Sequence, residues 1–165
     1  MRIVIQRVKG ASVTIDGALR SSIGQGMLIL VGICDEDTDE DIDYLCRKAI
    51  NMRIFDDAEG VMNIPITEVP DSGILVVSQF TLMASTKKGN RPSYIHASRP
   101  EFAIPMYEKF IAVLQGLFGR KIQTGEFGAD MQVSLVNDGP VTIIMDSKQR
   151  GPSATYRGSP RALRG

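Results

Sequence analysis

The residues best suited to chemistry follow a run of four aliphatic residues, 74–77. Such a run is typical of a strand that is covered on both faces. Because side chains alternate along a strand, Ser78 and Phe80 should share one face, and Gln79 and Thr81 the other. A buried polar group without a partner costs about 1–3 kcal/mol. Two hydroxyls and an amide at the end of a core strand therefore indicate either an internal hydrogen-bond network or a site.

Basic residues form a second candidate. Lys87, Lys88 and Arg91 lie close together in a polar segment. An ordinary solvated loop and a phosphate contact both fit this patch, since lysine and arginine position a nucleic-acid backbone without reading its sequence. Arg7 lies between core positions of the first predicted strand, so it is either an edge residue or a buried donor tied to carbonyls.

The dipeptide Gly139-Pro140 is a third candidate, because proline cannot donate a hydrogen bond to a β-ladder. An X–Pro bond is cis in about 5–6% of folded cases, so the sequence alone favours trans. A cis bond would present two successive carbonyls on one side of a rigid turn.

His96 is the only histidine, and a Ser–His–Asp hydrolase would need it. No nucleophile-elbow pattern accompanies it. A conventional esterase that uses His96 and a non-catalytic RNA-binding module remain alternatives. The acidic run 35–41 is typical of a helix start, and the chain has no Walker loop, His-Glu-x-x-His motif or Cys/His cluster. We therefore expect no metal and no cofactor.

Composition predicts one ordinary domain in the cytoplasm. The chain has 165 residues, of which 43% are hydrophobic, and no apolar run long enough for a membrane span. The N-terminus is too short and too strand-like for a signal peptide. Cys34 and Cys46 lie in apolar patterns, which indicates buried thiols. We expect no membrane partner.

The charge is unevenly distributed. The segment 147–165 carries five basic residues and no acid, which leaves 14 basic against 19 acidic residues in the body. A body with a net charge of −5 does not bind nucleic acid through bulk charge, so we expect no DNA partner. Any RNA contact must be local or use the tail.

Hydrophobic periodicity predicts an α+β fold, a mostly antiparallel sheet curled into a barrel-like core with two main helices packed on it. Asp16-Gly17 is a hairpin signal. Thr38 with Asp41 resembles a capping box, and Ser98 is a plausible N-cap for the second helix. The predicted strands are 2–8, 11–15, 18–23, 27–33, 73–82, 121–124, 131–136 and 141–146. The segment 61–66 contains Pro65 and is either an edge strand or a loop. We expect a single domain over 1–146 and a flexible basic tail over 147–165.

Several motifs together resemble the D-aminoacyl-tRNA deacylases, also called D-tyrosyl-tRNA deacylases. The most specific is the long run Met-Gln-Val-Ser-Leu-Val-Asn-Asp-Gly-Pro-Val-Thr at 131–142. The others are Ser-Gln-Phe-Thr-Leu at 78–82, Arg-Pro-Ser at 91–93, Gln-Thr-Gly at 123–125, Ile-Gln-Arg-Val at 5–8 and Arg-Ile-Phe at 53–55. The resemblance covers about 1–146.

The resemblance implies an editing enzyme that hydrolyses the ester of D-aminoacyl-tRNA, and also of glycyl-tRNA mischarged on tRNA(Ala). It implies a homodimer with each site at the subunit interface. The catalytic residues would be Ser78, Gln79, Phe80 and Thr81. Gly139 and Pro140, cis in the family, would enter the partner's pocket as a chirality filter. Arg7 and Met131 would support the site. The basic patch of Lys87, Lys88 and Arg91 is the expected tRNA contact, on the basis of its charge.

A filter of this kind is physically sensible. Attraction separates similar substrates weakly, since one methylene is worth only about 1–3 kcal/mol, whereas a rigid wall acts by exclusion. Carbonyls that hold the ammonium group and leave room only for hydrogen on the L side would pass D residues and glycine. We expect main-chain amides near Phe80 and Thr81 to stabilise the oxyanion, with help from the tRNA ribose. Thr81 as a nucleophile is the alternative, but no base is evident beside it.

Overall fold

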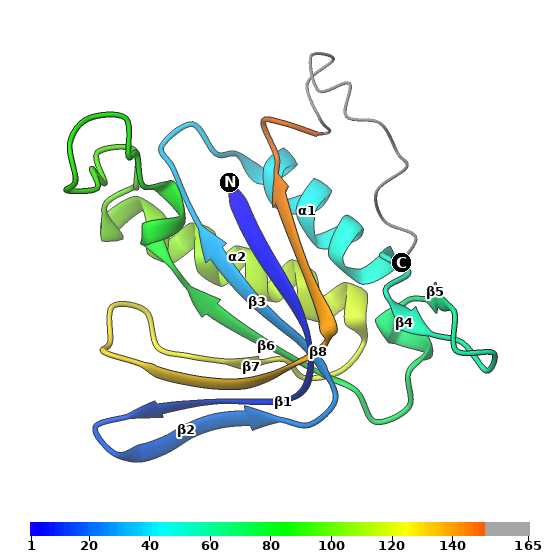
Figure 1. The fold of residues 1–165 in the computed structure, drawn as a ribbon. Coiled ribbons are helices and arrows are strands. Elements are labelled where there is room, and N and C mark those ends of the chain that lie inside the picture. The colour runs from blue at the N-terminus through cyan, green and yellow to red at the C-terminus, as the bar shows by residue number, and fades with distance from the viewer. Residues whose placement is uncertain (151–165) are drawn as a thin grey trace.

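The computed structural model describes residues 1–150. Figure 1 shows a curved sheet with two helices on one side of it. The strands are β1 (Arg2–Ile15), β2 (Ala18–Ile23), β3 (Gly26–Gly32), β4 (Phe55–Asp56), β5 (Met62–Ile64), β6 (Gly73–Ser78), β7 (Gln123–Thr124) and β8 (Gln132–Asp146). The helices are α1 (Asp39–Asn51) and α2 (Pro100–Phe118), with the short 3-10 turns η1 (Ile66–Glu68) and η2 (Phe80–Met83).

The long strand β1 organises the sheet because both of its edges are fully used. Its first half pairs with β3 and its second half with β2, while β8 runs antiparallel along the other edge. Asp16 and Gly17 both have positive φ, 50° and 77°, as the predicted two-residue hairpin between β1 and β2 requires. This hairpin projects at the lower edge of Figure 1.

The sheet is mixed. β3 pairs parallel with β6, and β6 pairs parallel with β7. Parallel neighbours need long crossover connections, which α1 and α2 supply here. The predicted α+β fold with a barrel-like sheet and two packed helices is confirmed, with the refinement that the sheet is not purely antiparallel. β4 and β5 form a separate two-stranded sheet beside it.

Residues 74–77 of β6 are buried on both faces, as predicted. Ile74 and Val76 belong to the large core that the sheet shares with both helices. Leu75 and Val77 belong to a second core inside the curved sheet. All four are at most 1% exposed. The strand is therefore packed on both faces up to the residue before Ser78.

The prediction that this strand continues to Thr81 is wrong. β6 ends at Ser78, and the N–H of Gln79 makes one more bond, to the carbonyl of Val31 at 2.8 Å. β3 itself ends at Gly32, so the ladder has no further partner. The chain then turns into η2, whose Leu82 packs so closely that a Cβ on Gly32 would lie 2.9 Å from Leu82 Cβ.

The prediction of two strands at 131–136 and 141–146 is also corrected. β8 is one element, and both of its halves pair with β1. Asn137 lies opposite Val8 and Thr142 opposite Gln6, so residues 138–141 leave the ladder where β1 has Arg7 alone. The proline is tolerated because this part of the strand makes no ladder bond.

The helix signals were largely right. Thr38 caps α1, and its N–H donates to the Asp41 carboxylate at 2.8 Å. α2 ends at Gly119, which has a left-handed φ of 75°. Its N-cap is Arg99 and not the predicted Ser98. Within residues 1–150, neither helix has the length and apolar character needed to cross a membrane.

The end of β8 is tied to the start of α1. Lys148 Nζ donates to the Asp41 carboxylate at 2.9 Å, and the N–H of Ser147 donates to the Met1 carbonyl at 2.9 Å. Both residues belong to the predicted tail, whose remainder, 151–165, lies outside the described residues. Tail flexibility and the single-domain boundary at 146 stay predictions.

Acid is expected to weaken the wild-type fold more than that of an Asp41→Asn variant. Burial raises the pKa of Asp41, but hydrogen bonds from Ser147, Lys148 and Thr38 outweigh it and hold the pKa well below 3.8. A carboxyl whose pKa falls on folding stabilises the protein above its unfolded-state pKa, and this contribution is lost as the pH falls. Urea titrations from about pH 6 to about pH 2 should show a steeper loss for wild type. Equal slopes for wild type and Asp41→Asn would contradict the prediction.

Candidate active site

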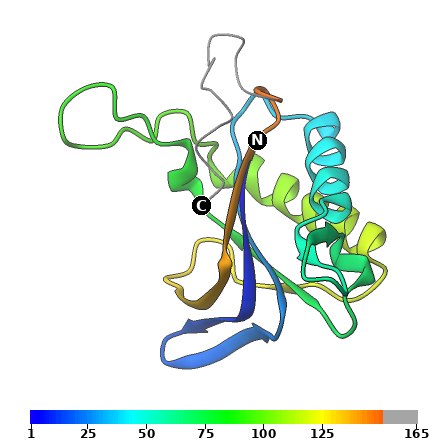
Figure 2. The ribbon, with the colours of Figure 1, turned by 45° about the vertical axis from the view of Figure 1, so that its right-hand side comes forward.

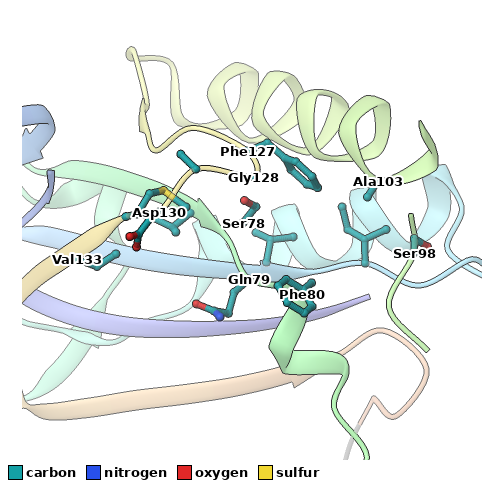
Figure 3. A pocket seen from close by; sticks show the side chains of 14 residues that line it. Ser78, Gln79, Phe80, Ser98, Ala103, Phe127, Gly128, Asp130 and Val133 are labelled. Atoms are coloured by element: carbon teal, nitrogen blue, oxygen red, sulfur yellow. The ribbon is translucent and has the colours of Figure 1, made fainter. Parts of the chain in front are cut away.

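A pocket of about 260 Å³ opens at the end of β6 (Figure 3). Ser78, Gln79 and Phe80 form one wall, and α2 contributes Ala103. The rest of the lining comes from β6 itself, from the end of β3 and the residue after it, from Ser98 just before α2, and from the loop before β8 and the start of that strand. These residues are Val31, Ile33, Val77, Ser98, Phe127, Gly128, Ala129, Asp130, Met131 and Val133. The pocket therefore has an apolar body with a few polar groups at its wall, which is the usual character of a small-molecule site.

The polar side chains at the pocket differ in how far they are already engaged. The Ser98 hydroxyl donates to the Asp35 carboxylate at 2.7 Å. The Gln79 amide nitrogen donates to the Thr81 hydroxyl. Ser78 lines the pocket, and none of the hydrogen bonds found among the described residues involves its hydroxyl. The predicted group at 78–80 is therefore brought together at one wall.

The main-chain N–H groups of Phe80 and Thr81 begin η2, and the first N–H groups of any helical turn lack an acceptor within that turn. Neither group donates a hydrogen bond to any atom in residues 1–150. In contrast, the N–H of Leu82 bonds the Gln79 carbonyl at 3.2 Å. Two adjacent donors are thus left over beside the pocket wall.

Thr81 does not line this pocket. It borders a larger groove of about 880 Å³, together with Leu82, Arg2 and the end of β8 at 143–146. Thr81 follows a turn and not a strand, so the predicted alternation does not apply to it. The sequence placed four residues in one site, and the structure divides them between two adjoining hollows.

Gly139 and Pro140 do not line the pocket of their own chain. Both are exposed, their peptide bond is cis, and Gly139 has a φ of +117° that side chains rarely adopt. A Cβ on Gly139 would lie 2.7 Å from Arg7 Nη2. Conformation and space both require glycine here.

Arg7 proves to be a buried donor tied to carbonyls, one of the two alternatives left by the sequence. It is 7% exposed. Its Nη1 donates to the Ile54 carbonyl at 2.8 Å and its Nε to the Asp138 carbonyl at 3.2 Å. The carboxylates of Asp56 and Asp138 lie 3.4 Å from the guanidinium. Arg7 therefore joins the turn at 138–141 to the body of the domain.

Comparison with known proteins gives the family of this chain. The family model described as D-Tyr-tRNA(Tyr) deacylase matches residues 4–146. The chain belongs to this family. The D-aminoacyl-tRNA deacylase of Flavobacterium johnsoniae is 63% identical over 150 residues, which are 91% of this chain and 99% of that protein. The D-aminoacyl-tRNA deacylase of Bacteroides thetaiotaomicron is 64% identical over 151 residues, with the same coverage.

A solved structure is similar to this chain in fold and sequence. The protein named c-Myc DNA Unwinding Element Binding Protein superposes with a TM-score of 0.83 at 40% identity, over 88% of this chain and 98% of its own. The name of that protein refers to DNA binding. For this deacylase we predict no DNA partner, and that prediction is untested. The predicted enzyme class, a hydrolase of the aminoacyl-tRNA ester, is confirmed by membership of the family.

The basic patch of the deacylase lies on the loop between η2 and α2, which projects from the body in both ribbon views (Figure 2). Two hydrogen bonds between the main chains of Ser85 and Ser93, at 2.8 and 2.9 Å, close this loop at its base. Lys87, Lys88 and Arg91 are all exposed on it. The patch is therefore presented to solvent beside η2.

Other candidate nucleophiles and bases fit poorly. His96 is exposed and does not line the pocket. Burial raises the pKa of the Cys34 thiol to about 11 and that of the Cys46 thiol to about 12, so neither is a ready thiolate. Among the described residues, no three acidic, histidine or cysteine side chains gather as metal ligands would.

Sequence reasoning missed Ala103 and the loop residues Phe127 and Gly128. Ala103 follows the apolar spacing of α2, so the sequence pattern could not distinguish it from an ordinary core residue. Phe127 lies between two glycines, Gly125 and Gly128, in a segment without periodicity. The only sequence signal for the loop was the presence of an aromatic residue, Phe127, in a segment that otherwise looks irregular. Met131, predicted as a support, lines the pocket, and its Sδ would lie 2.5 Å from a Cβ on Gly125.

Proposed function

We propose that this deacylase hydrolyses the ester that links a D-amino acid to the terminal ribose of tRNA, and that it rejects L-aminoacyl-tRNA. The observation that carries the proposal is the family match over 4–146, which includes the pocket wall, Arg7 and the turn at 138–141. The products are the free amino acid and tRNA. A D-amino acid trapped on tRNA is thereby released before it can be used.

Chirality is selected by Gly139 and Pro140 of a second copy of the chain. The turn is exposed and stands clear of the pocket of its own subunit, which supports a role in trans. On the outward face of β8, Val136 and Ile144 are 59% and 68% exposed, so the strand that carries the turn offers apolar area to a partner. In a homodimer joined by this face, the carbonyls of the turn hold the substrate ammonium group.

The exclusion of L substrates then follows from space. The turn leaves room only for hydrogen on the side where an L residue carries its side chain. Glycine has hydrogen on both sides, so glycyl-tRNA mischarged on tRNA(Ala) is accepted as well. The amino-acid side chain of a D substrate points outward and is not read, which gives broad specificity among D-amino acids.

Hydrolysis relies on position and electrostatics more than on a strong nucleophile. An aminoacyl ester is already reactive, and holding it beside a water molecule supplies much of the acceleration. The two unused N–H groups of Phe80 and Thr81 stabilise the oxyanion that forms when water attacks the carbonyl. The neighbouring ribose hydroxyl of the substrate helps to orient the water. Lys87, Lys88 and Arg91 bind tRNA phosphates on the projecting loop.

A Thr81→Ala variant is expected to keep its deacylase rate to within about threefold, because the N–H of residue 81 remains and the hydroxyl is not the nucleophile. The hydroxyl accepts a hydrogen bond from the Gln79 amide nitrogen, and the carboxylate that borders the same groove, Asp146, is already paired with Arg2 at 2.9 Å. Single-turnover hydrolysis of D-tyrosyl-tRNA measures the effect, with His96→Ala as a second variant that should also retain activity. Abolished turnover in a folded Thr81→Ala protein that still binds tRNA would instead favour covalent catalysis.

The proposed function itself is tested with matched D- and L-tyrosyl-tRNA and the purified protein. Rapid release of D-tyrosine with L-tyrosyl-tRNA left at its spontaneous rate supports it. Equal turnover of the two substrates refutes it. Binding of tRNA without ester hydrolysis would favour the RNA-binding module.

A further inference from the structure

The turn at 138–141 has two limbs, and different side chains hold them. β8 leaves the ladder after Asn137, opposite Val8, and returns to it at Thr142, opposite Gln6. The hydrogen bonds from Arg7 to this turn end on the Asp138 carbonyl, at the start of the turn. Something else must therefore fix the limb that follows Pro140.

Asn137 supplies this second anchor. Its Oδ1 accepts a hydrogen bond from the N–H of Val141 at 3.2 Å, and its Nδ2 donates to the Thr142 hydroxyl at 3.0 Å. The Asn137 amide, just before the turn, is thus bonded both to Val141 inside the turn and to Thr142 just after it. It also satisfies a main-chain donor that the interrupted ladder leaves without a strand partner.

We infer that Asn137 is a positioning residue for chiral selection, which it exerts by clasping the two ends of the turn that carries Gly139 and Pro140. The inference rests on the proposed function, in which the carbonyls of this turn form the filter. Proline has no N–H, and Gly139 is free of side-chain restraint, so the turn cannot fix its own carbonyls. Arg7 on the first limb and Asn137 across the base together determine where those carbonyls point.

The chemistry of the clasp makes a specific prediction about substitutions. An Asn137→Asp variant keeps an oxygen to accept the N–H of Val141, and the Thr142 hydroxyl can donate to its other oxygen. An Asn137→Ala variant loses both bonds. Two ordinary hydrogen bonds correspond to a change of about tenfold in a conformational equilibrium, so the turn should be displaced more often. A displaced turn no longer blocks the position of an L side chain, so L-aminoacyl-tRNA is hydrolysed more often.

The test compares wild type with Asn137→Ala, Asn137→Asp and Thr142→Val, using kcat/KM for D- and L-tyrosyl-tRNA. We expect the ratio of D to L turnover to fall about tenfold in Asn137→Ala, to stay near wild type in Asn137→Asp, and to fall less in Thr142→Val, which keeps the bond to Val141. Because the Thr142 side chain is exposed and that of Asn137 is half-buried, thermal unfolding should change little in all three variants. The ratio is a readout that a purely structural role would not move.

A wild-type ratio in Asn137→Ala overturns the inference, as does an Asn137→Asp variant that loses discrimination as fully as Asn137→Ala. If Asn137→Ala fails to fold, the ratio in Thr142→Val decides, and a wild-type value there also overturns the clasp. Failure of the proposed function looks different, because the wild-type protein would then treat the mirror-image substrates alike before any substitution is made.

Discussion

A Gly139→Ala variant is expected to lose about 10- to 100-fold of its D-aminoacyl-tRNA deacylase activity while remaining folded. A residue forced into a backbone conformation that suits glycine costs about 1–3 kcal/mol, and the turn relieves that strain by moving. The φ of +117° at Gly139 is such a conformation, and the added Cβ would also lie 2.7 Å from Arg7 Nη2. Both effects push the filter away from the position in which its carbonyls can hold the substrate.

The control for this prediction is Gly60→Ala. Gly60 has a φ of +76° in the polar turn between β4 and β5, and a Cβ there would meet no atom within 4 Å. It therefore carries a similar backbone strain without a contact to Arg7 or to the turn. Steady-state hydrolysis of D-tyrosyl-tRNA and thermal melting are measured on both variants. Equal activity in the two would contradict a specific role for the turn.

Replacing Phe80 with proline is expected to lower kcat by about 10²–10³, which is the usual effect of removing one oxyanion donor. Proline has no N–H, and the first position of a helical turn tolerates its fixed φ. Gln79, which precedes it, has a φ of −146° and a ψ of 85°, outside the α region that proline disfavours in its predecessor. The substitution should therefore remove the donor with little change of fold.

Phe80→Leu separates the side chain from the main chain. The Phe80 ring is 56% exposed and meets the Tyr94 ring edge-on at 5.2 Å between centroids, so losing the ring could itself weaken substrate binding. Leucine removes the ring and keeps the N–H. We expect Phe80→Leu to change KM more than kcat and Phe80→Pro to change kcat more than KM. A leucine variant with a kcat as low as that of the proline variant would exclude the main-chain role.

Local signals predicted much of the fold because they act over a few residues. The Asp16-Gly17 turn, the Thr38 cap and the Gly119 helix end depend on backbone conformations that those residue types favour. The aliphatic run 74–77 predicted a strand buried on both faces for the same reason. Parallel pairing of β3 with β6 was not predictable, since the local pattern of a buried strand does not reveal its neighbours.

The site was predicted less well where its geometry depends on contacts between distant segments. η2 replaces the expected strand end because β3 stops at Gly32, a fact about another element. Thr81 consequently borders the neighbouring groove and not the pocket, although its hydroxyl accepts a hydrogen bond from Gln79 in the pocket wall. Likewise, β8 pairs with β1 on both sides of its proline, and the turn between the two halves is bonded to Arg7, a residue of the other strand. The family motifs identified the residues at 78–81 and 139–140, but hydrophobic periodicity could not predict where they lie relative to one another.

The central claim is that Gly139 and Pro140 of one subunit complete the site of the other, and a mixed dimer tests it most directly. Chains carrying Gly139→Ala and chains carrying Phe80→Pro are coexpressed with different C-terminal tags, and the doubly tagged dimer is purified. One of its two sites combines an intact pocket with an intact partner turn, so it should recover about half of the wild-type D-tyrosyl-tRNA hydrolysis, although either variant alone is nearly inactive. A mixed dimer no more active than its parents, or a protein that yields no mixed dimer at all, would contradict the account.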